Sequence, residues 1–167
     1  MAVFLRICLW LLLPVAGYCQ VDSNAMFKLK KGNLLHPLEN CSGVSYHGKD
    51  TTLFTNIVCQ PGGVTLYGDS AGPVKSICEG RVVALINIGE NKGLITRYGD
   101  FFVTYYPLQA IPCSKGDWIR AGDFLGVLCG NAWEEFGVEV YISQKIERLD
   151  DMEKWFIDYP AFGVKSP

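Results

Sequence analysis

The sequence predicts an all-β fold, a single small β-sandwich or barrel with one short helix near its C-terminus. Short apolar segments recur along the chain, and their apolar residues alternate with the two-residue period of a half-buried strand. Turn residues separate these segments every eight to twelve positions, a spacing typical of sandwiches and barrels. Only one segment has a convincing helical pattern. The length of 167 residues suits one domain of ordinary size.

The strands are expected where alternation and turns coincide. Within residues 81–88 one face of the expected strand carries Val82, Ala84, Ile86 and Ile88. Gly99-Asp100 is a compact hairpin signal, residues 91–93 mark another turn, and residues 121–123 mark a tight reversal. We therefore expect strands at residues 81–88, 93–98, 101–105, 118–120, 124–128 and 137–143.

The expected helix covers residues 151–156. Asp150 is a suitable N-cap, and Glu153 at the third helical position completes an arrangement like a capping box. The polar residues 20–32 are expected to form a loose lead-in, residues 33–158 the β domain, and residues 159–167 a C-terminal tail.

The first 19 residues have the pattern of a cleaved secretory signal. Arg6 precedes an apolar run that ends at Pro14, which is too short to cross a bilayer of about 30 Å comfortably. Cleavage after Tyr18 or Cys19 is expected, and lipidation of Cys19 is the alternative, to which the bulky Tyr18 is a poor fit. The protein is therefore expected to be periplasmic or secreted, with no membrane span after cleavage.

Composition excludes two classes of protein. The formal net charge of −2 provides no basic field for phosphates, so a nucleic-acid partner is not expected. Aromatic residues make up 13% of the chain and charged residues only 19%, which argues against a disordered chain.

Five cysteines remain after the expected cleavage: Cys41, Cys59, Cys78, Cys113 and Cys129. An oxidising compartment allows two disulfides and one free thiol, and the spacing leaves their pairing open. No pair has the short C-x-x-C spacing of a structural zinc site. Disulfides or buried structural thiols are thus the expectation.

The order of motifs resembles that of LytM-type, lysostaphin-like domains. Residues 61–88 (PGGVTLYGDSAGPVKSICEGRVVALINI) resemble the opening core of these domains, and residues 101–130 resemble the segment that follows it. Residues 135–142 (EFGVEVYI) stand where the family has H-x-H-F-E, and DDMEKWF resembles its closing helix. The resemblance implies a small β-sandwich whose sheet forms a groove. Active members are zinc endopeptidases of bacterial cell wall.

The resemblance also implies that the zinc site is degenerate. The family's first two zinc ligands correspond to Pro61 and Thr65, and the third to Gly137. Its assisting histidines correspond to Pro107 and Glu135. Catalytic zinc needs three protein ligands and an open position for water. Proline and glycine have no side-chain donor, so no metal, cofactor or catalytic residue is expected here.

The mature chain has only two histidines, and both precede every motif. His36 is expected to be a packed or surface imidazole and His47 a loop residue. A metal site built from His47, Asp50 and a cysteine matches no common ligand spacing. Glu139 matches the trailing Glu of the family motif. The alternative interpretation is an exposed strand position between Val138 and Val140.

Four aromatic residues, Phe101, Phe102, Tyr105 and Tyr106, alternate between the two faces of one expected strand. One face is expected to belong to the core. The aromatic side chains of the other face could stack on sugar rings, fill a pocket of a partner or form a second packed layer.

These observations predict an exported, non-catalytic binding or regulatory module similar to the murein hydrolase activators. Its expected partner is a cell-wall amidase or peptidoglycan itself. Two other classes remain open: a zinc peptidase of peptidoglycan with unusual ligands, and a recognition module unrelated to the wall. The expected groove-lining residues are Thr65, Tyr105, Pro107, Gly137 and Glu139.

Overall fold

The computed structural model describes residues 22–47, 62–130, 135–149 and 151–157. The expected signal segment, Cys59 and Pro61 lie outside these residues. In chain order the elements are α1 (Ser23–Lys28), β1 (Gly43–His47), β2 (Gly63–Gly68), β3 (Pro73–Lys75), β4 (Gly80–Ile88), β5 (Asn91–Tyr98), β6 (Phe101–Gln109), β7 (Trp118–Ile119), β8 (Phe124–Gly130), β9 (Phe136–Gln144), β10 (Glu147–Arg148) and the 3-10 helix η1 (Met152–Lys154).

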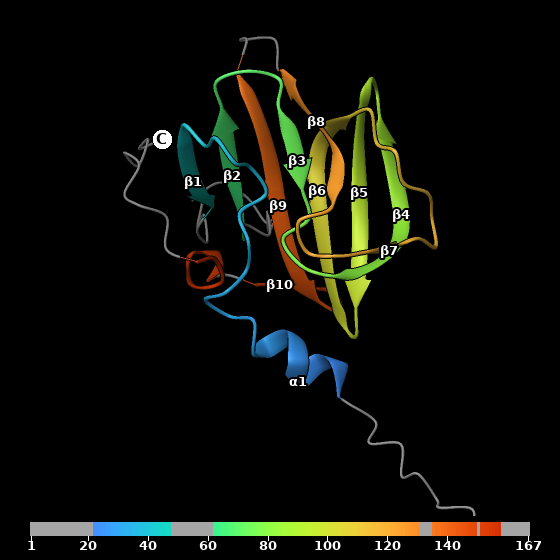
Figure 1. Ribbon diagram of the computed structural model, residues 1–167. Helices are drawn as coiled ribbons and strands as arrows, with labels where there is room; N and C mark the ends of the chain where they lie inside the picture. The colour runs from blue at the N-terminus through green and yellow to red at the C-terminus, as the bar shows by residue number, and fades with distance from the viewer. Residues whose placement is uncertain (1–21, 48–61, 131–134, 150, 158–167) are drawn as a thin grey trace, which may run out of the picture.

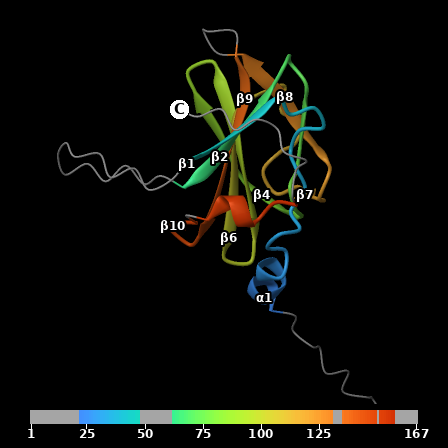
Figure 2. The ribbon, with the colours of Figure 1, turned by 90° about the vertical axis from the view of Figure 1, so that its left-hand side faces the viewer.

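The strands form one antiparallel sheet that bends back on itself, which confirms the all-β expectation. Its strand order is β1-β2-β9-β8-β6-β5-β4-β7, with β10 paired to β9, β3 paired to β8, and an additional pairing between β9 and β6. Figure 1 shows the long strands β9, β6, β5 and β4 running side by side, with α1 at one end. Figure 2 shows β7 and β8 on one side of these long strands. Among the described residues, no helix has the length and apolar character needed to cross a membrane.

Alternation along the strands decides which side chains enter the core. Phe101, Val103 and Tyr105 of β6 are buried, as are Val138 and Val140 of β9. The intervening residues point to the opposite face of the sheet. The expected split of the aromatic residues is confirmed, because Phe101 and Tyr105 are core residues whereas Phe102 and Tyr106 are not.

Two expected turns differ in detail. The turn between β4 and β5 is Gly89-Glu90, because Ile88 pairs with Asn91 and Gly89 adopts a φ of 61°. Residues 91–93 are therefore strand, and Gly93 fits there because a side chain would meet the carbonyl oxygen of Tyr105 at 3.2 Å. The reversal at residues 121–123 is present and connects β7 to β8. The two strands do not pair with each other as a hairpin would, because each pairs with other strands of the sheet.

The lead-in differs from expectation because part of it is the helix α1. Asp22 caps this helix by accepting a hydrogen bond from the backbone of Asn24 at 2.9 Å. Phe27 is fully buried, and its ring stacks on Phe101. One apolar anchor inside a polar segment thus gives the helix its place in the fold.

The expected C-terminal helix is only one turn of 3-10 helix, Met152–Lys154. Asp150 lies outside the described residues, and Asp151 occupies the N-cap position without a side-chain capping bond. Its carboxylate accepts hydrogen bonds from Lys31 and from the indole of Trp155 instead.

Candidate functional site

The face of the sheet opposite the core, here called the outer face, brings together two of the positions matched to zinc ligands, Thr65 and Gly137, with Glu139. Thr65 of β2 lies directly opposite Glu139 of β9, and Gly137 lies opposite Tyr67. Tyr106 of β6 flanks Glu139 on its other side. Residues directly opposite in an antiparallel pair point to the same face, so these side chains are neighbours.

His47 belongs to this site, which corrects its assignment to a loop. It is the last residue of β1, opposite Gly63, and its Nε2 lies 2.6 Å from Oγ1 of Thr65. The signal in the sequence was the alternation of Val44 and Tyr46 with Ser45 and His47. That pattern indicates a strand whose polar face carries the imidazole.

The described residues do not fit a family-type zinc site. Thr65 is buried, and its hydroxyl is already hydrogen-bonded to His47. A side chain added at Gly137 would have its Cβ 3.4 Å from the Tyr67 ring and 3.5 Å from a methyl group of Thr65. Within the described ranges, no group of three or more His, Cys, Asp or Glu side chains is placed to hold a metal ion. The donor set therefore offers a hydroxyl and a bare backbone where zinc needs strong ligands.

Three charged or polar side chains run along the outer face next to this position. The Tyr141 hydroxyl donates a hydrogen bond to Glu139, and the Arg148 guanidinium lies 4.2 Å from the centre of the Tyr141 ring. The ring passes over Gly63, where an added Cβ would lie 2.5 Å from it. Burial and the nearby Glu139 raise the pKa of Tyr141, so its hydroxyl remains protonated at neutral pH.

Negative charge collects at the other end of the site. Burial raises the pKa of Tyr67, and the carboxylates of Glu135 and Glu139 raise it further. Glu135 is exposed and immediately precedes β9. Phenol and carboxylates together can accept hydrogen bonds from a cationic or amide group.

Tyr105 is not a groove residue, which corrects the expectation. It is fully buried, and its hydroxyl accepts a hydrogen bond from the backbone of Ile77 at 3.0 Å and lies 3.3 Å from Oγ of Ser76. Burial raises its pKa. Phe101, Val103 and Tyr105 face the core, so Tyr106 is the residue that lies beside Glu139. Pro107 is half-buried in the same strand.

His36 is a packed imidazole, as expected. Its ring stacks on Phe156 at 5.2 Å, and its Nε2 lies 2.7 Å from the carbonyl oxygen of Ile157. Burial lowers its pKa, because the charged form is poorly solvated there.

The four cysteines that the structure describes, Cys41, Cys78, Cys113 and Cys129, are free thiols. The expectation of disulfides is not confirmed among these four residues, and three of them are buried, as expected of structural thiols. Burial raises the pKa of Cys78 to about 12. Cys129 donates a hydrogen bond to Asn91 and accepts one from Gln109.

Comparison with solved structures shows a common fold. Csd3 of Helicobacter pylori matches with a TM-score of 0.57 and 16% identity over 75% of this chain, which spans 35% of the Csd3 chain. A chain of the SpoIIQ–SpoIIIAH pore-forming complex matches with a TM-score of 0.59 and 15% identity, over 77% of this chain and 92% of its own. A mutant catalytic domain of the M23 protein EnpA from Enterococcus faecalis matches with a TM-score of 0.55 and 17% identity, over 70% and 93%.

The fold of this chain is that of LytM-type, M23 peptidase domains. No protein-family model and no curated protein sequence matches it. At 15–17% identity the likeness establishes the architecture, and the chemistry has to be argued from the residues themselves.

Proposed function

We propose that the chain is an exported, non-catalytic LytM-like module that binds peptidoglycan or a cell-wall amidase. One observation carries the proposal: the two described positions that resemblance assigns to zinc ligands hold Thr65 and Gly137. Thr65 is hydrogen-bonded to His47, and Gly137 lies opposite Tyr67 in the β2–β9 pair. A site rebuilt from hydroxyl, phenol and carboxylate groups suits hydrogen bonding to a partner better than activation of water by a metal.

The neighbouring structures support a role in recognition. The same fold occurs in the catalytic domain of EnpA and in the SpoIIQ–SpoIIIAH complex, where it is part of an assembly with another protein. A fold shared by a catalytic domain and by a chain of a complex is compatible with a module that retains the scaffold and uses it to bind. The signal-like N-terminus supports a periplasmic or secreted location, where wall and amidase are both accessible.

A zinc peptidase with rearranged ligands is the second candidate. The position of His47 favours this candidate. The imidazole is hydrogen-bonded to Thr65, and Thr65 lies directly opposite Glu139 in the β2–β9 pair. An imidazole and a carboxylate are both zinc ligands, but a third protein ligand is needed.

The test combines wall digestion, wall binding and amidase stimulation. The purified chain is incubated with peptidoglycan sacculi with and without zinc, and with a cell-wall amidase. We expect no soluble fragments from the chain alone, together with either sedimentation with the sacculi or faster release by the amidase. Glu139→Gln should weaken that effect, whereas Glu147→Gln, on the opposite side of the β9–β10 hairpin, should not.

Two results would contradict the proposal. Stoichiometric zinc with zinc-dependent fragment release would establish the peptidase. Absence of both binding and stimulation would contradict the proposal and favour a recognition module unrelated to the wall.

A further inference from the structure

We propose that a row of side chains on the outer face binds an acidic polysaccharide through the carboxylate groups of its sugars. The row runs across the strands and consists of Arg81, Arg97, Phe102, Ser143 and Arg148. On β9 it lies four residues beyond Glu139, so it is separate from the positions matched to the zinc site. The inference therefore goes beyond the proposed function and does not depend on it.

The pairing of the strands places these residues in line. Arg97 of β5 is directly opposite Arg81 of β4 on one side and Phe102 of β6 on the other. Ser143 of β9 is in turn directly opposite both Phe102 and Arg148 of β10. Opposite residues share a face, and the neighbours of the row along its strands are buried in the core: Val82, Thr96, Phe101 and Ile142. Four steps between adjacent strands give the row a length of about 19 Å.

Arg81 and Arg97 are like charges in directly opposite positions, an arrangement that destabilises a pair of strands. Both residues are exposed. Arg81 donates a hydrogen bond to the carbonyl oxygen of Gly116 at 3.2 Å, and none of the described carboxylates forms an ion pair with it. An anion bound between the two guanidinium groups would offset their repulsion, so this pair is the centre of the proposed site.

Arg97 is held in place and still has donors for a ligand. Its guanidinium lies over the ring of Phe102, 5.4 Å from the centre, and its Nε donates a hydrogen bond to the carbonyl oxygen of Gly99 at 2.6 Å. The Asp100 carboxylate is 4.0 Å away, at the limit of an ion pair, and it also accepts a hydrogen bond from Asn24. Since a guanidinium has five N–H donors, these contacts leave several for a carboxylate.

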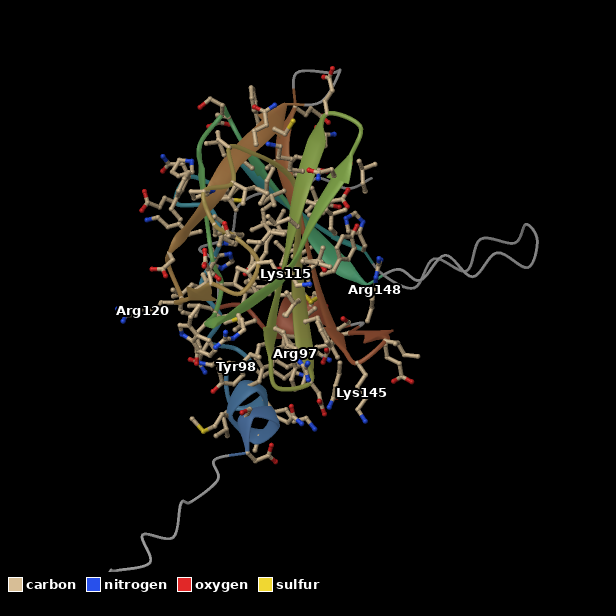
Figure 3. All side chains as sticks on the ribbon, turned by 90° about the vertical axis from the view of Figure 1, so that its right-hand side faces the viewer. Arg97, Tyr98, Lys115, Arg120, Lys145 and Arg148 are labelled. Carbon is tan, nitrogen blue, oxygen red and sulfur yellow. The ribbon has the colours of Figure 1, made fainter. Side chains whose placement is uncertain are left out.

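The row is also positively charged at its β10 end. The Arg148 guanidinium lies over the Tyr141 ring, and Figure 3 shows Arg148 and Lys145 on one side of the sheet, with Arg120 on the other. The nearby carboxylate of Glu139 accepts a hydrogen bond from the Tyr141 hydroxyl. A linear ligand with repeated negative charges complements two cationic ends separated by a ring and a hydroxyl group.

Two observations favour a polysaccharide over other linear anions. The strands β5, β6 and β9 are paired on both sides, so the row offers no free backbone to which an extended peptide could add as a strand. The net charge of −2 opposes the dense phosphates of a nucleic acid. An acidic polysaccharide supplies carboxylates for the guanidinium groups and hydroxyl groups for Ser143.

Affinity electrophoresis with defined polymers tests the inference. The probes are polygalacturonate, which has a carboxylate on every sugar, neutral dextran, and oligo-dT as a phosphate polymer. We expect polygalacturonate to retard the protein, less so as salt is raised, and dextran to have no effect. Arg81→Gln and Arg97→Gln should each weaken binding about threefold to tenfold. Arg120→Gln makes the same change in charge on the other side of the sheet and should bind like the wild type. The urea midpoint of each variant distinguishes lost binding from lost folding.

Three outcomes would overturn the inference: no retardation by polygalacturonate, equal weakening in Arg120→Gln and Arg97→Gln, or tighter binding of oligo-dT than of polygalacturonate. The last result would assign the row to a nucleic acid. The sacculus and amidase assays separate these failures from failure of the proposed function. If those assays are negative and polygalacturonate still binds, only the proposed function is wrong. In the converse case, only the polysaccharide site is wrong.

Discussion

Phe27 and Phe101 stack face to face, with ring centroids 4.3 Å apart and planes inclined by 17°. One residue comes from the N-terminal helix and the other from the start of the central strand β6. Trp155 closes the cluster, with its ring centroid 5.6 Å from that of Phe27. The two ends of the described chain are thus fixed to the same end of the sheet.

Phe27→Ala should therefore destabilise the whole domain. Removal of a fully buried aromatic ring leaves a cavity and typically lowers the free energy of unfolding by about 3–5 kcal/mol. Urea denaturation measures the change. Met26→Ala, at an exposed position of the same helix, is the control and should have little effect. Equal effects of the two substitutions would mean that α1 does not seal the core.

The contact between His47 and Thr65 should be visible as a coupling energy. Their hydrogen bond is part-buried, so its net contribution is about 0.5–1.5 kcal/mol. Unfolding free energies of the wild type, His47→Ala, Thr65→Val and the double variant give the coupling directly. Strictly additive effects would show that the two side chains do not interact in solution.

Asp151 should make the protein more stable near neutral pH than in acid. The hydrogen bond from Lys31 lowers its pKa, and the bond from Trp155 acts in the same direction. Because the folded pKa lies below the unfolded value of about 3.9, the stabilisation is complete above that value and is lost as the pH falls through the folded pKa. Asp151→Asn should therefore cost stability at pH 7, and the difference from the wild type should close in acid.

Urea denaturation of both proteins at pH 7, 5 and 3 measures this difference. Glu153→Gln, at an exposed position of η1, is the control. A difference that stays constant over the three pH values would contradict the assigned role of the carboxylate.

The thiols should differ in reactivity because they differ in burial. Burial raises the pKa of Cys78 to about 12, and Cys113 is only half-buried. In the folded protein, iodoacetamide at pH 8 should modify Cys113 well before Cys78, since the thiolate is the reactive form. Peptide mass spectrometry follows the labelling.

After unfolding without reductant, all four described cysteines should react. Residues that become labelled only after reduction would reveal disulfides. Because these four cysteines are free thiols, we also expect that reductant leaves the unfolding midpoint unchanged.

Local patterns were sufficient to predict the strands around Gly99-Asp100 and the alternation that buries Phe101 and Tyr105. Such patterns report which face of a segment is apolar, and that information is contained in neighbouring residues. The resemblance to LytM-type domains misplaced Tyr105 in the groove, because a matched motif does not specify which face of β6 a position occupies. The helix of residues 23–28 was missed because its single apolar anchor, Phe27, forms no repeating pattern.

The sequence by itself determined the all-β class, which follows from short-range alternation and turns, and the lack of side-chain donors at Pro61 and Gly137, which follows from residue identity. The resemblance to LytM-type domains implied that these two are zinc-ligand positions. Tertiary structure alone decided that His47 meets Thr65 and that Arg148 lies over Tyr141. These pairs depend on which strands become neighbours and in which register. That choice results from burying the whole core at once, and no local segment contains it.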